Sequence, residues 1–183
     1  MASEPVKGYE SVEITENYCR GKGQIISYGE YSGRLNFTFS TSRDTAFIQF
    51  TDLIGRKSLF MILSNNDARV WDIIHNQQYD LATIMLSFPL FELIQPEDLR
   101  TLLWGQIPAA FHPDENNRMN SIKAGTIQFY SKQTEYGPLV SEINFTVGSQ
   151  QKVKLTIIDR EFGSTYPHLE REIPSAIPLS KMD

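Results

Sequence analysis

Residues 45–64 read TAFIQFTDLIGRKSLFMILS and are the most informative segment of the chain. It contains two apolar runs, residues 45–51 and 58–64, joined by the short connection DLIGRK at residues 52–57. Gly55 can adopt a positive φ without strain, so a tight reversal of the chain is favourable in this connection. The stretch therefore predicts two antiparallel strands that pair as a hairpin.

Further strands are expected on both sides of this hairpin. Leu35, Phe37 and Phe39 alternate with polar residues, which predicts a strand with one apolar face. Similar alternation recurs near the C-terminal end, where a short connection at residues 148–150 suits another hairpin. We expect antiparallel strands at residues 24–28, 34–40, 45–51, 58–64, 68–74, 123–132, 139–147 and 152–159.

Two apolar segments after the central strands are expected to form short helices. Leu81, Ile84 and Phe88 fit helical spacing, and Pro89 is expected to end that helix. A second helix is expected at residues 96–104, where a proline and two acidic residues suit the first turn. Strands followed by short apolar helices predict a mainly β (α+β) fold. We expect a curved antiparallel sheet or open half-barrel, covered by lid helices, with an apolar cavity between.

The length and charge of the chain limit its class. A chain of 183 residues suits a single domain, which we expect at residues 9–183 after a flexible arm at residues 1–8. A further short helix is expected at residues 11–20, ending at Gly21. The net charge of −5, without a dense basic face, argues against nucleic acid as a partner. The first residues lack the features of a signal peptide, and Cys19 is the single cysteine.

The sequence contains no recognisable catalytic constellation. Its three histidines, His75, His112 and His168, are far apart and lack metal-ligand spacing. Neither a nucleophile elbow nor a phosphate-binding glycine loop is present. We therefore expect no catalytic residue, no metal and no cofactor.

The apolar lid segment instead predicts a binding cavity. Residues 81–94 have almost no polar face, so their side chains must be buried against the sheet. A curved sheet beneath such a lid can enclose a pocket for an aliphatic ligand. Which alternating face of each strand lines that pocket is left open. The residues expected to line it are Phe37, Phe39, Phe50, Leu59, Met61, Leu63, Trp71 and Ile73 from strands, and Leu81, Ile84, Phe88, Phe91, Leu99 and Leu103 from the lid.

The connection at residues 52–57 is unusual because Leu53 and Ile54 are large aliphatic residues at a position where turns normally carry small or polar ones. Either a side chain folds back on the sheet edge, or the pair forms an exposed apolar tip. Arg56 and Lys57 follow directly, and an exposed tip could enter acyl chains while these cations meet anionic headgroups.

Several segments in order resemble the LolA/LolB family of lipoprotein carriers and outer-membrane lipoprotein receptors. The similar segments are residues 47–55, 59–63, 67–72, 91–94, 98–100 and 103–108. The family's turn contains a proline that is missing from Asp52-Leu53-Ile54-Gly55. The tryptophan and glycine of its helix are separated, whereas Trp104 and Gly105 are adjacent.

The resemblance implies an open half-barrel whose cavity accepts the acyl chains of lipoproteins or lipids, without catalysis. It implies a location in the bacterial periplasm or at the inner face of the outer membrane, with a periplasmic carrier protein and that membrane surface as partners. The receptor's turn carries an exposed leucine that matches Ile54 and helps to pass lipoproteins into the membrane. A receptor's signal and acylated N-terminal cysteine are not seen in this chain. Two alternatives remain open: a module for another apolar ligand or an envelope assembly factor, and an enzyme acting on a lipid ester.

Overall fold

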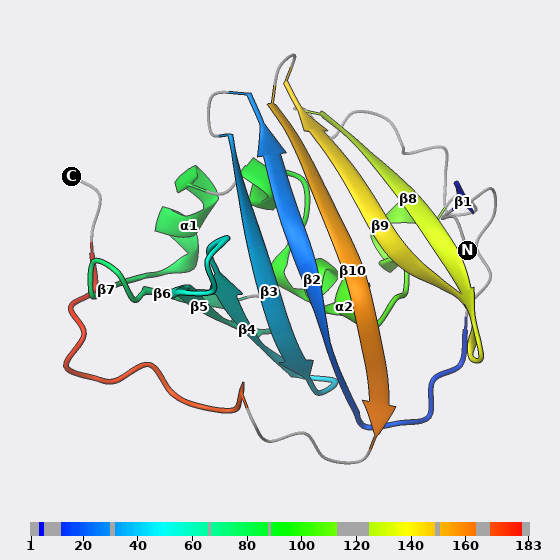
Figure 1. Cartoon of the computed structure of the whole chain (residues 1–183), viewed down its shortest axis with the longest axis horizontal. Coiled ribbons are helices and arrows are strands. Elements are labelled where there is room, and N and C mark those ends of the chain that lie inside the picture. Colours follow the sequence, from blue (N-terminus) through cyan, green and yellow to red (C-terminus); the bar gives the residue numbers. More distant parts are fainter. Residues whose placement is uncertain are drawn as a thin grey trace.

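The strands form one curved, open antiparallel sheet. A computed structural model describes residues 4–5, 12–29, 32–65, 67–87, 89–112, 125–148, 151–163 and 169–180. Ten described strands follow the order β1-β8-β9-β10-β2-β3-β4-β5-β6-β7, and neighbouring strands are antiparallel throughout. Short helices cover one face of this sheet (Figure 1). The predicted fold class, a curved antiparallel sheet with lid helices, is confirmed.

The boundaries of the described elements agree with most of the predicted ones. The strands are β1 (Glu4–Pro5), β2 (Tyr18–Tyr28), β3 (Gly33–Thr41), β4 (Thr45–Thr51), β5 (Lys57–Ser64), β6 (Asp67–Asp72), β7 (Gln77–Tyr79), β8 (Gly125–Thr134), β9 (Gly137–Val147) and β10 (Gln151–Gly163). The helices are α1 (Leu81–Ser87) and α2 (Pro96–Leu103), with 3₁₀ turns η1 (Pro89–Glu92) and η2 (Ala109–Phe111).

The helix predicted at residues 11–20 is wrong. Its described part is not helical, and β2 begins within it and runs on to Tyr28. Two inward positions of β2 are glycines, so the apolar alternation of the strand is hidden. A Cβ on Gly21 would lie 2.7 Å from the ring of Phe39, and one on Gly23 would lie 2.4 Å from the ring of Phe37. The glycines therefore make room for two aromatic rings of β3, at the expense of the sequence signal.

The main core lies between the sheet and the helices. On β4 the even-numbered residues Ala46, Ile48 and Phe50 point into it, whereas on β5 the odd-numbered residues do so, as the side-chain period of two requires. Helix α2 buries Leu99, Leu102 and Leu103 against them. We call this covered side of the sheet the inner face.

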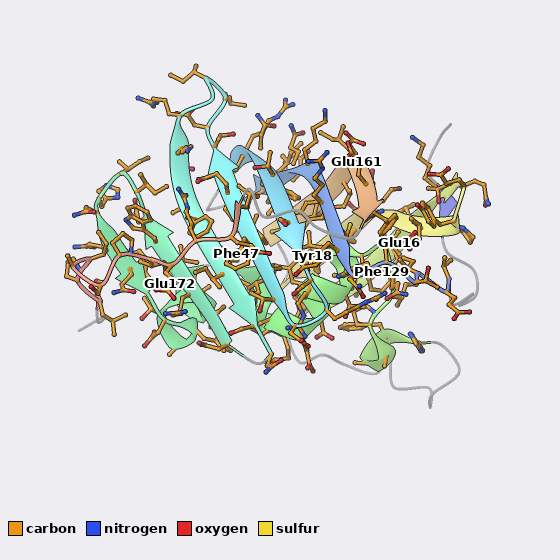
Figure 2. The ribbon with its side chains drawn as sticks, turned by 90° about the horizontal axis from the view of Figure 1, so that it is seen from below. Glu16, Tyr18, Phe47, Phe129, Glu161 and Glu172 are labelled. Atoms are coloured by element: carbon orange, nitrogen blue, oxygen red, sulfur yellow. The ribbon has the colours of Figure 1, made fainter. Side chains whose placement is uncertain are left out.

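A second, smaller apolar cluster occupies the opposite, outer face of β4–β6. It consists of buried Phe60, Ile62, Ile173 and Ile177, with Phe47, Trp71 and Ile73 packed against them. The two isoleucines after position 170 belong to residues 169–180, which we call the C-terminal strap. Figure 2 shows the strap crossing the outer face of these strands near Phe47. Both faces of β4 and β5 are thus covered, which explains why their sequences are apolar almost throughout.

Candidate functional site

The inner face brings together most of the residues predicted to line a cavity. Phe37, Phe39 and Phe50 form a row of tilted aromatic rings, with Phe37 lying 6.2 Å from Phe39 and 5.8 Å from Phe50 between ring centroids. Each of the three is at most 3% exposed. The other predicted residues that belong to the same cluster are Leu59, Met61, Leu63, Leu81, Ile84, Phe91, Leu99 and Leu103.

Two predicted lining residues are on the other side of the sheet. Trp71 and Ile73 pack in the outer cluster beneath the strap, so their assignment to the cavity is wrong. The reason is register: Met61 pairs with Val70, which places Ala68 and Val70 on the inner face and turns Trp71 outward. Phe88, also predicted to line the cavity, is outside the described residues.

Helix α2 is tied to the sheet by a buried arginine that the sequence analysis did not single out. Arg160 of β10 donates from Nε to the carbonyl oxygen of Leu103 (2.8 Å) and from Nη2 to those of Leu102 (3.4 Å) and Val140 (3.0 Å). It therefore caps the C-terminal end of α2, where the helix dipole favours a cation. Burial lowers the pKa of Arg160 to about 10, against the opposing influence of Cys19.

The residues around the end of α2 add further ties. The guanidinium of Arg43 lies 4.0 Å from the ring centre of Trp104, whose indole Nε1 donates to the carbonyl oxygen of Ser42. Arg100 donates to the carbonyl oxygen of Asp44. These contacts fix α2 on the sheet. The other helix of this layer, α1, has seven residues, and its Met85 is 39% exposed.

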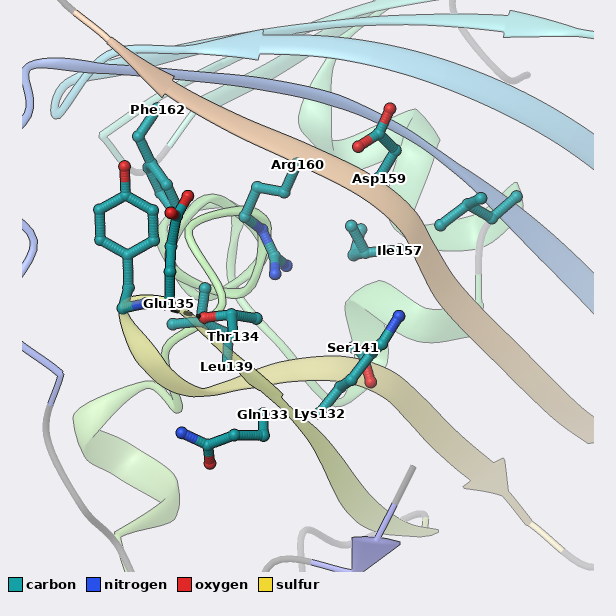
Figure 3. A pocket seen from close by; sticks show the side chains of 12 residues that line it. Lys132, Gln133, Thr134, Glu135, Leu139, Ser141, Ile157, Asp159, Arg160 and Phe162 are labelled. Atoms are coloured by element: carbon teal, nitrogen blue, oxygen red, sulfur yellow. Dashed lines mark hydrogen bonds between the residues drawn. The ribbon is translucent and has the colours of Figure 1, made fainter. Parts of the chain in front are cut away.

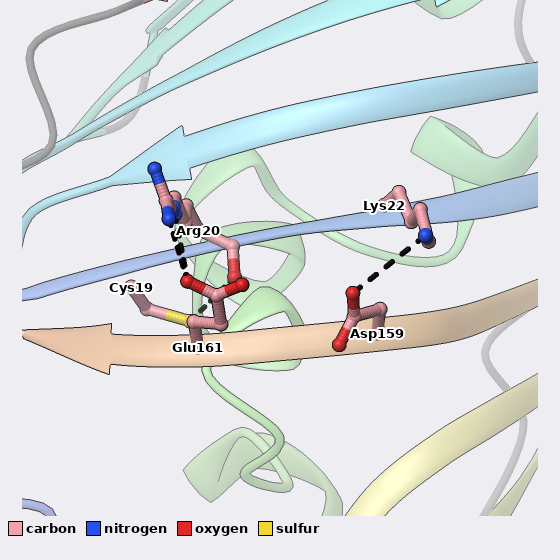
Figure 4. Close-up of polar contacts among 5 residues, drawn as sticks. All are labelled: Cys19, Arg20, Lys22, Asp159 and Glu161. Atoms are coloured by element: carbon pink, nitrogen blue, oxygen red, sulfur yellow. Dashed lines mark hydrogen bonds and ion pairs between the residues drawn. The ribbon is translucent and has the colours of Figure 1, made fainter.

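Cys19 is buried beside the C-terminal end of α2, where its thiol is shielded from solvent. Burial raises the pKa of its thiol to about 12, although Arg160 and Arg43 act in the opposite direction. On the other face of the same strand, Arg20 pairs with Glu161 at 2.7 Å and Lys22 with Asp159 at 3.7 Å (Figure 4). Because these pairs join β2 to β10 at the surface, they contribute to strand pairing and do not form a reactive site.

The hairpin between β4 and β5 ends in an exposed apolar tip. Leu53 is 67% exposed and Ile54 is 76% exposed. The turn is closed below them by Asp52, whose side chain accepts hydrogen bonds from the backbone of Ile54 (3.0 Å) and Arg56 (2.9 Å) and from Arg56 Nε (2.7 Å). These bonds hold the pKa of the Asp52 carboxyl below its usual value. Of the two expectations for the turn, the exposed tip is confirmed and the folded-back side chain is wrong.

A pocket of about 300 Å³ lies where β9 and β10 separate. The two strands pair from Gln151 to Thr156 of β10, after which β10 continues beside β2 alone. Figure 3 shows Arg160 reaching into this gap between the strands. None of the predicted cavity residues lines this pocket, which is bordered by Lys132, Gln133, Thr134, Glu135, Tyr136, Leu139, Ser141, Ile157, Ile158, Asp159, Arg160 and Phe162.

The described residues contain neither a candidate metal centre nor a candidate membrane-spanning helix. Among them, no three histidine, cysteine or acidic side chains are grouped so that they could hold a metal ion. No helix in the described part of the chain is long and apolar enough to cross a membrane.

The fold is an open antiparallel sheet whose inner face is covered by short helices. Neither a protein-family model nor a curated protein matches the sequence. Among solved structures, the chain is similar to an uncharacterized conserved protein from Thermus thermophilus, with a TM-score of 0.46 and 10% identity over 87% of this chain and 90% of that chain. It is also similar to a LolA superfamily protein from Nitrosomonas europaea, with a TM-score of 0.44 and 10% identity over 93% of each chain.

Proposed function

We propose that this protein binds acyl chains of lipoproteins or lipids between the sheet and the helices and delivers them to a membrane through the β4–β5 tip. The observation that carries the proposal is the exposure of Leu53 and Ile54 at the end of a hairpin whose inner face belongs to the apolar interior. A tip of this kind is costly in water and favourable among acyl chains.

The interior suits an apolar ligand. Its aromatic and aliphatic side chains come from both layers, and the cluster around Phe37, Phe39 and Phe50 consists of apolar side chains. Burying a methylene group contributes about 0.8 kcal/mol, so a chain of about 16 carbons gains roughly 10 kcal/mol before ordering costs. Such affinity does not require a charged contact with the ligand.

Entry of a long chain requires part of the lid to open. Because Arg160, Arg43 and Arg100 tie α2 to its surroundings, we assign the moving part to α1 and η1. Elements that move are usually those with low local stability, and α1 is too short to be stable alone. A saturable signal from an apolar fluorescent dye, displaced by fatty acid, tests the interior; a lack of saturable binding contradicts the proposal.

The transfer step is tested at the tip. Ile54→Glu is expected to preserve folding and dye binding, because the side chain is 76% exposed, and to reduce delivery of a bound lipopeptide to liposomes sharply. Ile158→Glu is the matched control, since Ile158 is 57% exposed on β10, well away from the tip in sequence and strand order. Equal delivery by both variants would contradict a role for the tip, and unfolding of Ile54→Glu would show a structural one.

The finer assignments belong to the same proposal. They are transfer of lipoproteins to the outer membrane from the periplasm, and exchange with a carrier protein there. The alternative function, a module for another apolar ligand or an assembly factor, is favoured if organic extraction of the purified protein yields a ligand without acyl chains. Hydrolysis of a lipid ester by the purified protein would instead support an enzyme.

A further inference from the structure

The outer face of β4–β6 differs from the rest of the outer surface of the sheet. Where β2, β9 and β10 meet, cross-strand ion pairs cover the surface, such as Arg20 with Glu161 and Lys154 with Glu142. On β4–β6 several outward positions instead carry aromatic and aliphatic side chains, namely Phe47, Phe60, Ile62 and Trp71, and Ile73 follows directly after β6. Among the described residues, the C-terminal strap, residues 169–180, lies across this apolar surface and contributes Ile173 and Ile177 to it (Figure 2).

Arg171 anchors the strap to β4 and β5 near the β4–β5 tip. The guanidinium of Arg171 lies 4.1 Å from the ring centre of Phe60 and 5.8 Å from that of Trp71. Its Nη2 also donates to Oε1 of Gln49 on β4, at 2.5 Å. Ile173 is the adjacent apolar anchor, 8% exposed.

The other end of the strap is held by the edge strand β7. The backbone nitrogen of Gln78 donates to the carbonyl oxygen of Pro178 (3.0 Å), and its carbonyl oxygen accepts from Ser180 (2.8 Å). The side chain of Gln78 donates to the carbonyl oxygen of Ile177 (2.6 Å), and Gln78 forms a parallel bridge with Leu179. The strap is therefore attached at two ends, while most of its residues are exposed.

The cover leaves polar atoms of the outer face unpartnered. Trp71 Nε1 and Ser58 Oγ are both buried, and neither has a hydrogen-bond partner among the described residues. A buried polar group without a partner costs about 1–3 kcal/mol. Tryptophan combines an apolar ring with an N–H donor that needs a polar partner. It is therefore common where a membrane meets water. The strap therefore buries the apolar side chains of this face but provides no hydrogen-bond partner for Trp71 Nε1 or Ser58 Oγ.

The covered face lies close to apolar residues that are already exposed. Ile73 donates its backbone N–H to Ser58 at the end of the same strands, and the next residue, Ile74, is 63% exposed. The β4–β5 tip with Leu53 and Ile54 is at the same end, because β4 ends and β5 begins there. The outer cluster, Ile74 and the tip therefore lie at one end of the sheet.

Charge favours the same partner when the strap is removed. The strap presents the exposed acids Glu170 and Glu172 beside its arginine. The strands beneath carry two exposed cations, Lys57 and Arg69, and one exposed acid, Asp67. Removing the strap would take away two acids and one arginine, a net charge of −1, and leave aromatic residues beside Lys57 and Arg69, a combination that suits an anionic lipid surface.

We propose that the outer face of β4–β6 is a lipid-binding surface and that the C-terminal strap is its releasable cover. A bilayer that contacts the exposed β4–β5 tip binds the uncovered form better than the covered one and so shifts the strap toward release. Trp71 then enters the headgroup region, where its indole N–H gains a partner. This surface is separate from the interior and does not depend on a ligand there.

A disulfide across the strap tests the proposal on the full chain. Gln78→Cys with Leu179→Cys joins two residues that face each other in a bridge, a spacing that suits a disulfide. Vesicles of phosphatidylglycerol and phosphatidylethanolamine are sedimented with the oxidised and the reduced protein. We expect about tenfold weaker binding when oxidised, equivalent to about 1.4 kcal/mol, and recovery on reduction. Equal binding in both states overturns the proposal.

Brominated lipids provide a second reading that requires no disulfide. The chain has two tryptophans, and Trp104 is only 3% exposed, so quenching by the lipids reports on Trp71. Arg171→Ala removes the anchor over Phe60 and is expected to increase both vesicle binding and quenching; unchanged quenching overturns the proposal. Dye binding to the interior is measured in parallel. If only dye binding to the interior is lost, the proposed function is contradicted. If dye binding is kept but vesicle binding and quenching do not depend on the strap, the role of the strap as a cover is contradicted.

Discussion

Replacing Arg160 with methionine tests whether one buried cation holds α2 on the sheet. The guanidinium serves three carbonyl oxygens, those of Leu102, Leu103 and Val140. Leu102 retains a second donor, the backbone N–H of Gly105 at 2.9 Å, whereas Val140 and Leu103 would lose their strong donor. Methionine fills part of the volume but donates no hydrogen bond.

The size of the effect follows from two opposing contributions. Two carbonyl oxygens left without a strong donor cost about 2–6 kcal/mol together. Removing the guanidinium also relieves its desolvation, the same burial that lowers the pKa of Arg160 to about 10. Since water in the adjoining pocket can reach part of the gap, we expect a net loss of about 2–3 kcal/mol in the free energy of unfolding.

Urea unfolding and amide exchange together measure this prediction. The loss of stability is expected to be accompanied by faster exchange in α2, while β4 stays protected to the level of global unfolding. Arg160→Lys is the matched control: it retains the charge but cannot serve all three oxygens, so its loss should be intermediate. The reasoning is refuted if Arg160→Met unfolds within about 0.5 kcal/mol of the natural protein and α2 exchanges as before.

Three further predictions concern the sheet, the cysteine and the lid. Gly23→Ala is expected to destabilise the protein by about 1–3 kcal/mol in urea unfolding, because its Cβ would meet the ring of Phe37, whereas Gly33→Ala, with open space around it, should not. Cys19 should resist a thiol reagent at pH 8 in the folded protein. Because burial raises its pKa from 9.0 to about 12, the unfolded chain loses this proton first; stability should fall from pH 9 toward pH 12, and less steeply in Cys19→Ala. Amide exchange should be faster in α1 than in α2, and slow on addition of fatty acid.

The strands were largely predictable from the sequence, because alternation on β3, β9 and β10 follows directly from burial of one face. The missed half of β2 shows the limit of this reasoning. Gly21 and Gly23 occupy inward positions, but their contribution is the space they leave for rings on β3. Only the pairing of Gly23 with Phe37 and Gly21 with Phe39 reveals that role. The order of the sheet, with β10 beside β2, likewise depends on contacts between distant segments.

The sequence predicted which apolar residues are buried at the candidate site, but not on which face of the sheet each of them lies. Most of the predicted lining residues share the inner cluster because any large apolar residue near the helices had to be buried there. Trp71 was indistinguishable from them in the sequence, since both faces of its strand carry apolar residues. Arg160 was missed because a lone arginine on a strand usually indicates a solvated face. Its role depends on the end of α2, which is 57 residues away in sequence from Arg160.

The apolar run of β5 contains information that its interpretation as a one-sided strand does not use. An antiparallel strand with one face in water alternates, whereas residues Leu59 to Leu63 are apolar at every position. In such a run adjacent residues must be buried against different partners. Met61 is buried against the inner cluster and Phe60 against the strap, at 2% and 0% exposed. The uninterrupted run therefore implies a second cover for the sheet, and the chain supplies one at residues 169–180. Because that cover is held by Arg171 at one end and Gln78 at the other, its attachment can be changed without altering the interior.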